Sequence, residues 1–335
     1  MKLSFLELPI DERRLYIEEA AARRGVSPVV LEKDFWVCWL LAVLFRSSFG
    51  EHLVFKGGTS LSKVFGVIDR FSEDIDLSLS PKFLGLEAAG TSRNQATKWM
   101  AKAEAACGVA VRETIAPELE RLVVHVLGER PGRWFEYLTD PATHSPVLLF
   151  HYPTIELRGF EYLKRSVKLE FGSLTDQQPV GRHPVRPWIA ETLEQAFPDW
   201  ACEVVSLEAE RTFWEKATIL HAECHRSAEK PTPDRFSRHY ADTAALAAHP
   251  VADVALKQAE LRDRVVEWKA RFFGSSWARY DLARPGTFRL VPSPERIFEL
   301  RRDYQAMRVM YLSEPPGFDD VVRSLKYLED KINSG

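Results

Sequence analysis

The clearest hydrophobic pattern in the chain lies between residues 35 and 45, where apolar residues recur at helical spacing. This run is too short to span a bilayer and follows three charged residues, so it predicts a buried core helix. Ser27 and Pro28 give this helix a start, because proline suits the first helical position. An earlier helix is predicted from about Asp11 to Gly25, since glycine is typical of a helix C-terminus. The apolar positions of the core helix are Trp36, Trp39, Leu40, Val43 and Leu44.

Shorter apolar or alternating runs predict the strands of a sheet. They cover residues 52–55, 75–80, 147–152 and 166–172. Helices are predicted at about 60–67 and 88–127, and the proline-rich residues 176–190 form a loop or a sheet edge.

Long helices dominate the pattern from residue 208 onward. They are predicted at about 208–225, 234–248, 254–273 and 294–312. The whole order predicts an α+β fold, with a mixed sheet flanked by helices and then a helical half. We place the boundary near residue 200, so that one domain covers 1–200 and a helical domain covers 201–335.

Composition and charge narrow the class of protein. At 335 residues, with 45% apolar and 28% charged residues, the chain is an ordinary globular protein. A net charge of −3 excludes a generally cationic nucleic-acid coat but leaves room for a local basic groove. The four cysteines are dispersed without a C-x-x-C pair, which favours reduced core residues. The sequence begins with no signal-peptide pattern, so we expect a cytoplasmic protein without a membrane span.

The segment KGGTSLSKVFGVIDRFSEDIDL, residues 56–77, carries the most informative chemistry. A glycine pair and two hydroxyl residues follow an apolar strand, and two aspartates come later within a strand-like run. Residues two apart in a strand share a face, so Asp74 and Asp76 project to one side. A tight glycine turn that holds phosphate and paired carboxylates that hold a divalent metal would suit this order. The turn residues are Gly57, Gly58, Thr59 and Ser60.

The strand SVKLEFG, residues 166–172, adds a second polar face. Lys168 and Glu170 lie on one side of it, with apolar residues on the other. If this strand neighbours the first, three carboxylates and a lysine meet, and their repulsion favours a Mg²⁺ ion, with Mn²⁺ as the alternative. Each strand alone also fits an ordinary amphipathic strand with one wet face, and a glycine pair alone marks a turn. The combination in this order is the more specific signal.

These motifs resemble a known family. The order of glycine turn, paired aspartates and later acid is similar to that of the nucleotidyltransferase superfamily that includes DNA polymerase β. More narrowly, KGGTSLSK…DRFSEDIDL and SVKLEFG resemble the first two motifs of the AbiEii/AbiGii toxins. The helical segments ERTFWEKATILHAECHR and RHYADTAAL resemble a third conserved segment of these toxins. The residues EKD at 32–34 belong to the same resemblance. The resemblance implies a polymerase-β-like core completed by the helical domain.

The resemblance also implies a role for each matched residue. The glycine turn, Gly57 to Ser60, would bind the phosphates of an NTP. Asp74 and Asp76 would hold Mg²⁺, with Glu170 in the place of the third acid. Lys168 and Lys216 would neutralise phosphate charge, and Asp242 would orient a substrate or act as a base. The spacing from Gly58 to Asp74 is long for the wider superfamily, and a glutamate as third acid leaves direct metal ligation in doubt.

The implied activity is transfer of a nucleotidyl group from an NTP to RNA, at a tRNA 3′ end, with growth arrest and an antitoxin encoded nearby. Basic residues with which an RNA backbone could pair are Lys164, Arg165, Arg182, Arg186, Arg211, Arg226, Arg235 and Arg238. Two alternatives stay open: a non-catalytic nucleotide- or partner-binding module, and a small-molecule nucleotidyl- or phosphotransferase. Asp242 also fits a plain helical ion pair with Arg238, four residues earlier.

Overall fold

A computed structural model of the chain describes residues 3–87, 92–141, 143–155 and 164–334. It divides into two compact units. The first consists of Met1–Val64, Phe71–Gly90 and Lys98–Ser206, and the second of Phe65–Arg70, Thr91–Thr97 and Leu207–Gly335. The chain thus passes into the second unit at Leu207, near the boundary drawn at residue 200, and the second unit also takes the six residues from Phe65 to Arg70.

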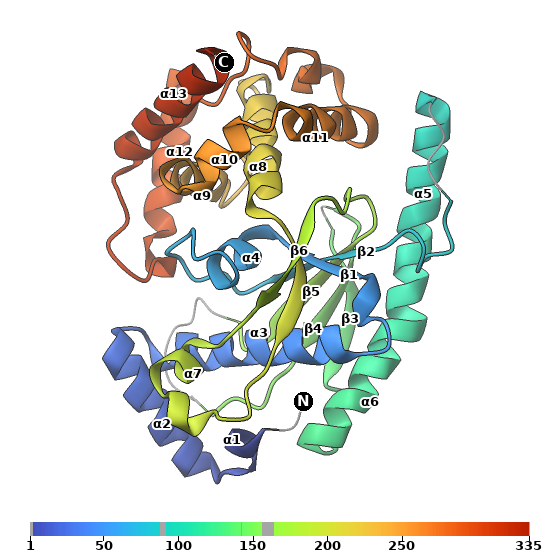
Figure 1. Cartoon of the computed structure of the whole chain (residues 1–335), viewed down its shortest axis with the longest axis vertical. Coiled ribbons are helices and arrows are strands. Elements are labelled where there is room, and N and C mark those ends of the chain that lie inside the picture. The colour runs from blue at the N-terminus through green and yellow to red at the C-terminus, as the bar shows by residue number, and fades with distance from the viewer. Residues whose placement is uncertain (1–2, 88–91, 142, 156–163, 335) are drawn as a thin grey trace. The chain divides into compact units, whose positions relative to one another are not determined.

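A mixed sheet organises the first unit (Figure 1). Within the described residues it has seven strands in the order β3-β4-β5-β2-β1-β7-β6. β2 pairs in parallel with β5, and β1 with β7, whereas β1–β2, β3–β4 and β4–β5 are antiparallel. The strands are β1 Leu53–Lys56, β2 Ile75–Leu79, β3 Phe135–Thr139, β4 Pro146–Phe150, β5 Val167–Gly172, β6 Val180–Pro184 and β7 Glu203–Leu207.

Helix α3 (Pro28–Arg46) supplies the core of this unit. Every residue from Val29 to Leu44 is buried, as the apolar run predicted. The rings of Trp36 and Trp39 lie 6.0 and 5.9 Å from the ring of Phe150 on β4. The other helices up to residue 192 are α1 Ser4–Glu7, α2 Ile10–Arg24, α4 Gly57–Lys63, α5 Arg93–Ala110, α6 Ala116–Leu127 and α7 Trp188–Thr192.

Alternation along the strands separates two faces of the sheet. In β2 and β5 the odd-numbered residues, such as Leu77 and Leu169, are fully buried. The even-numbered residues carry the polar side chains, including Asp76 and Glu170. Because β2 and β5 pair in register, the polar residues of both strands lie on the same face. The predicted placement of Asp76 and Glu170 on a common face is therefore confirmed, whereas Asp74 lies in the loop before β2.

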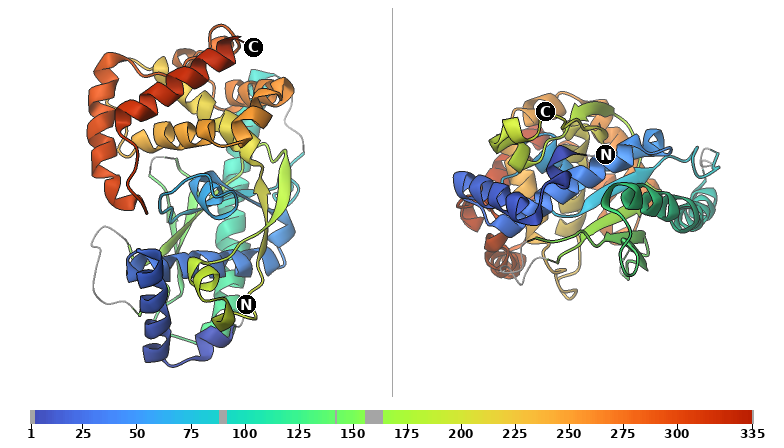
Figure 2. Two further views of the ribbon diagram at one scale, coloured as in Figure 1. Left: turned by 60° about the vertical axis from the view of Figure 1, so that its left-hand side comes forward. Right: turned by 90° about the horizontal axis from the view of Figure 1, so that it is seen from below.

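The second unit is helical. Helix α8 contacts α9, α10 and α11, and α9 in turn contacts α12 and α13 (Figure 1 and Figure 2). No helix in the described parts of the chain is long and apolar enough to cross a membrane. The helices are α8 Ala209–Cys224, α9 Ser237–Ala248, α10 Val251–Leu256, α11 Ala259–Phe272, α12 Pro294–Ala306 and α13 Phe318–Ser334.

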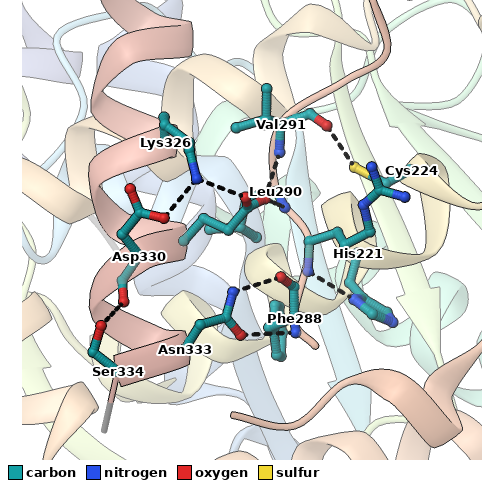
Figure 3. Close-up of polar contacts among 11 residues, drawn as sticks. His221, Cys224, Phe288, Leu290, Val291, Lys326, Asp330, Asn333 and Ser334 are labelled. Atoms are coloured by element: carbon teal, nitrogen blue, oxygen red, sulfur yellow. Dashed lines mark hydrogen bonds and ion pairs between the residues drawn. The ribbon is translucent and has the colours of Figure 1, made fainter. Parts of the chain in front are cut away.

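An extended segment, residues 288–291, lies between α8 and α13 (Figure 3). Its backbone groups bond to side chains instead of to a sheet. Asn333 accepts from Phe288 N at 2.9 Å and donates to Phe288 O at 2.9 Å, and His221 Nδ1 accepts from Arg289 N at 3.1 Å. Glu329 accepts from the next two amides, at 2.6 and 3.2 Å. These contacts provide hydrogen-bond partners for the backbone of a segment in which Phe288 and Leu290 are buried.

Several predicted elements differ from the structure. The helix after the glycine pair begins at Gly57 and ends at Lys63, rather than covering 60–67. The helix predicted over 254–273 is two helices, α10 and α11. The helical segment 88–127 is interrupted by a π-turn at Val111–Ile115, and its first four residues lie outside the described part. The sequence analysis missed α1, α7, α13, β3 and β7. Four of these have only four or five residues, which is too short for a clear period. Helix α13 does carry an apolar stripe at helical spacing, which was overlooked.

Candidate active site

The polar face of the sheet brings together three residues distant in sequence. Lys56 on β1 and Glu170 on β5 are both register partners of Asp76 on β2, so the three form a row across the sheet. Asp74 lies in the loop just before β2, close enough to Asp76 and Lys168 for their charges to affect its pKa. Burial, followed by the negative charges of Asp76 and Glu73, raises the pKa of Asp74 to about 6. A divalent cation would relieve this accumulation of negative charge.

The glycine turn lies directly against one of these carboxylates. Gly57 has φ +83°, and a Cβ atom placed on it would lie 2.0 Å from Asp76 Oδ2. Only glycine therefore allows this approach of carboxylate and backbone. The hydroxyl groups that follow are buried and bound internally: Ser60 Oγ donates to Gly57 O at 2.9 Å, and Thr59 Oγ1 contacts Asp74 O and, at 2.8 Å, Ser72 Oγ. Thr59 thus connects the turn to the loop that carries Asp74.

Lys168 and Glu170 are paired with each other. Their Nζ and Oε2 atoms are 2.8 Å apart, and Lys168 Nζ also lies 3.1 Å from Asp140 Oδ2. Burial opposes the charge of Lys168, but the bonds to Glu170 and Asp140 outweigh it and raise its pKa to about 12. Glu170 additionally accepts a hydrogen bond from Ser145 Oγ at 3.2 Å. Asp140 was not identified from the sequence, because it lies in a loop outside every motif.

Within the described residues, no group of three or more His, Cys, Asp or Glu side chains gathers closely enough to hold a metal ion. Asp74 and Asp76 supply oxygen ligands of the kind that Mg²⁺ prefers. The carboxylate of Glu170 is occupied by Lys168. The three-carboxylate metal set therefore stays a prediction, and the donors present fit a cation whose other ligands come from substrate and water.

Three consecutive charged residues of α3 bind the segments that carry this site. Lys33 Nζ pairs with Glu73, next to Asp74, and donates to Lys164 O at 2.7 Å. Asp34 Oδ1 lies 2.7 Å from Lys63 Nζ at the end of α4. The preceding residue, Glu32, accepts from the backbone and side chain of residues 154–155, and Asp34 also accepts from the backbone of α7 at 2.6 Å. All three are buried, so α3 fixes both the glycine helix and the aspartate loop.

The second unit holds Lys216 and Asp242 in another buried cluster. Lys216 Nζ lies 2.6 Å from Asp242 Oδ2, and Arg70 binds both oxygens of Asp242 at 2.9 Å each. Burial opposes the charge of Asp242, but Arg70 and Lys216 outweigh it and hold its pKa far below the usual range. These two cations hold Asp242 in its ionised form, and its role as a base or as an orienting residue stays a prediction. The alternative pairing with Arg238 is replaced by Arg70, which the pattern could not reveal across 172 positions.

Burial lowers the pKa of Lys216, against the opposing effect of Asp242. Lys216 belongs to the second unit, whereas Asp74 and Asp76 belong to the first. That Lys216 acts together with these carboxylates stays a prediction. Within the second unit, Asp242 is therefore held between two cations, Arg70 and Lys216.

Comparisons with known proteins identify the family and the fold. The model of the family described as nucleotidyl transferase AbiEii toxin, type IV toxin–antitoxin system, matches residues 39–324. Among solved structures, the chain is similar to MenT4, a nucleotidyltransferase toxin from Mycobacterium tuberculosis H37Rv, with a TM-score of 0.51 and 16% identity. That match covers 96% of this chain and 90% of the other and concerns the fold. No curated protein sequence matches the chain. The chain belongs to the AbiEii family of nucleotidyltransferase toxins from type IV toxin–antitoxin systems.

Proposed function

We propose that the protein transfers a nucleotidyl group from an NTP to a hydroxyl group of RNA, at the 3′ end of tRNA, in a reaction that requires Mg²⁺. The observation that carries this proposal is the contact of Asp76 with Gly57 beside a second carboxylate, Asp74, whose pKa is raised to about 6. In the reaction, the acceptor oxygen bonds to the α-phosphorus of the NTP, and the bond from that phosphorus to pyrophosphate breaks.

Asp74 and Asp76 would hold the metal, and Mn²⁺ would serve in place of Mg²⁺. When bound, the ion neutralises the carboxylates and polarises the reacting phosphate. The backbone N–H groups of Gly57 and Gly58 would bind phosphate oxygens, because neither residue has a side chain to block the approach. Thr59 and Ser60 act here by fixing the turn, since both are buried.

The lysines would bind the negative charge of the NTP. Lys168 stays protonated over the physiological range and lies on the polar face with the carboxylates. Glu170 would position Lys168, and it would ligate the metal only after giving up that ion pair. Lys216 would also neutralise phosphate charge, with Asp242 as the residue that positions it.

The acceptor and the partners follow from the family and the substrate chemistry. RNA is a polyanion, and the basic residues Arg182 and Arg186 in the first unit would pair with its phosphates. NTPs and tRNA are both cytoplasmic, so we place the reaction there. A type IV toxin has an antitoxin, and we expect it to be encoded next to this gene.

The deciding experiment incubates the purified protein with each α-labelled NTP, Mg²⁺ and total cellular RNA. We expect label on small RNA with one or a few NTPs, and at least about a 1,000-fold loss in Asp76→Asn, where metal binding is removed. Asp263→Asn, on an exposed site of α11, serves as the matched control and should retain the wild-type rate.

Other outcomes select among the alternatives. Label on the protein instead of on RNA would show that the acceptor is a protein hydroxyl group. Transfer of the γ-phosphoryl group from a γ-labelled NTP to a small molecule, with release of NDP, would indicate a phosphotransferase. A wild-type protein that binds NTP but transfers nothing, even with RNA from its own host, would overturn the catalytic proposal. In cells, we expect expression to arrest growth and Asp76→Asn to abolish the arrest at equal protein level.

A further inference from the structure

A lysine at the end of β1 lies on the polar face of the sheet. Lys56 directly precedes the glycine turn and is the register partner of Asp76 on β2. Residues directly opposite each other in an antiparallel pair project to the same face, with Cβ atoms about 4.5–5.5 Å apart. The side chain of Lys56 therefore leaves the sheet beside the Asp76 carboxylate. The motif KGGTSLSK contains this lysine, but the motif by itself implied no role for it.

The ammonium group of Lys56 is available to a ligand. Among the described residues it has no hydrogen-bond or ion-pair partner, although the side chain is half-buried. The Oδ2 atom of the neighbouring carboxylate, Asp76, is directed to Gly57 instead. A charge that is partly removed from water and lacks a protein partner gains from an anion that enters from solvent.

The other lysines of the motifs and of α3 are already bound to acids. A lysine in such a pair can turn to a phosphate only by giving up a carboxylate, so part of the energy of the new contact is lost. Lys56 has no such partner to give up. The pairs are Lys33 with Glu73, Lys63 with Asp34, Lys168 with Glu170 and Lys216 with Asp242.

Lys56 and Lys168 lie on opposite sides of β2. Strand β1 with Lys56 is one neighbour of β2, and β5 with Lys168 is the other. Lys56 is level with Asp76, and Lys168 lies close enough to Asp74 to affect its pKa. The two outer strands are about 9–10 Å apart, and the flexible four-carbon stems of both lysines can reach one polyanion between them.

We propose that Lys56 is a phosphate-binding residue, whose ammonium group contacts the phosphate chain of the NTP on the β1 side of Asp74 and Asp76. This inference rests on the proposed function, because it adds a residue to the NTP site of that reaction. A polyphosphate can contact Lys56 and the metal through different phosphate groups, so the length of the chain sets the affinity. Lys56 contributes a charge and hydrogen-bond donors, and no covalent bond to it forms or breaks.

The test measures binding without transfer. Inorganic tripolyphosphate, inorganic phosphate and each NTP are titrated into the full-length protein with excess Mg²⁺ and without RNA, by calorimetry. Lys56→Met keeps the length of the side chain and removes its charge. We expect this variant to bind tripolyphosphate and NTP at least about tenfold more weakly, the scale of a lost hydrogen bond to a charged group, with a smaller change for phosphate.

Two further variants separate a contact with the ligand from a general effect of charge. Lys56→Arg keeps the charge and should restore most of the affinity. Lys82→Met removes an exposed lysine from the segment after β2 and is the matched control, with affinity as in the wild type.

Thermal unfolding distinguishes ligand binding from a structural role. Lys56→Met should unfold at the wild-type temperature, because no ion pair is broken. Lys168→Met should unfold at a lower temperature, because it leaves Glu170 without its partner. A structural role for Lys56 would instead lower its unfolding temperature together with the affinity.

Two results would overturn the inference alone. One is a Lys56→Met protein that binds tripolyphosphate and NTP within about twofold of the wild type. The other is an equal loss of affinity in Lys82→Met. No saturable binding of either ligand by the wild type up to about 10 mM would overturn the inference together with the NTP site. A wild type that binds tripolyphosphate through Lys56 but transfers nothing to RNA would support the inference and contradict only the proposed reaction.

Discussion

At the scale of single residues, the carboxylate of Asp76 lies where a Cβ atom on residue 57 would be, so the site can hold one or the other. The Oδ2 atom of Asp76 occupies the place of a Cβ atom on Gly57, at 2.0 Å from its ideal position. The backbone of Gly57 also has a positive φ, which side chains rarely adopt. The geometry of the carboxylate therefore depends on the absence of a side chain one strand away.

Gly57→Ala should displace the Asp76 carboxylate while leaving the fold in place. We expect transfer activity to fall by about 100-fold, the scale of an ångström-sized misplacement, with a cost of about 1–3 kcal/mol in stability. Gly66→Ala is the matched control, because Gly66 also has positive φ but has open space around its Cβ position. Rates of label incorporation and thermal unfolding measure both. Equal loss of activity in the two variants would contradict the contact with Asp76.

The raised pKa of Asp74 gives a pH signature. A native pKa of about 6 against 3.8 in the unfolded chain means that the native state holds the proton more tightly. The contribution of Asp74 to stability is therefore fully present at acid pH and is lost as the pH rises from about 4 through 6. Asp74→Asn removes this loss, so it should stabilise the protein by about 1–2 kcal/mol at pH 7.5 and by much less at pH 4.

Denaturant unfolding in EDTA, at both pH values, measures this difference for wild type and Asp74→Asn. Added Mg²⁺ should stabilise the wild type at pH 7.5 and have a smaller effect on the variant. A difference between the two proteins that grows toward acid pH would show that folding does not raise the pKa of Asp74.

At the scale of elements, α3 does more than fill the core. Its three charged residues, Glu32 to Asp34, each hold a different segment of the first unit. The apolar neighbours of these residues bury the charges, so each charge needs a partner, and the partners are parts of the site. A core helix thereby sets the positions of α4 and of the loop before β2.

Asp34→Asn tests this role. It removes the negative charge beside Lys63 at the end of α4 but keeps an oxygen for the backbone of α7. Leaving Lys63 buried without its counter-charge should cost about 3–5 kcal/mol. Glu19→Gln is the control, because Glu19 forms an exposed ion pair with Arg23 on α2, worth less than about 1 kcal/mol. Urea unfolding of both variants gives the two values, and similar costs would refute the role of α3.

At the scale of the whole molecule, short segments from the first half of the sequence belong to the second unit. Phe65–Arg70 comes from the first half of the sequence but belongs to the second unit, where Arg70 neutralises Asp242. The helical half is consequently not a separate block of sequence. A cut at residue 206 separates the helices from a residue that their interior requires.

A fragment of residues 207–335 should therefore fold poorly by itself. Without Arg70, the buried Asp242 keeps one cation instead of two, and removal of one partner from such a group costs about 3–5 kcal/mol. We expect the fragment to unfold at lower urea concentration than the full chain, or to lack a cooperative transition. Arg70→Met in the full chain should reproduce much of this loss. A fragment as stable as the full chain would contradict the role of Arg70.

Sequence reasoning reached much of the fold and of the site because both rest on local patterns. The period-two alternation of 75–79 and 167–172 placed Asp76 and Glu170 on one face, as observed. The helical period of 35–45 gave the core helix. Motifs confined to one turn and one strand carry their spacing in the sequence, so the family followed from them.

Side-chain partners across distant segments could not be predicted in this way. Arg70 and Asp242 lie 172 positions apart, and Lys168 chooses Asp140 and Glu170 from many possible acids. No periodicity relates such residues, because their proximity results from the packing of whole elements. The same limit concealed the internal bonds of Thr59 and Ser60, which the sequence had assigned to phosphate.

The sequence by itself thus determined the fold class, the family and the polar face of the sheet, since these follow from local spacing. Tertiary structure alone decided which charges neutralise one another: Asp242 between Arg70 and Lys216, Glu170 with Lys168, and Asp34 with Lys63. The physical reason is that an ion pair depends on distance and burial, and both arise only when separate segments pack together.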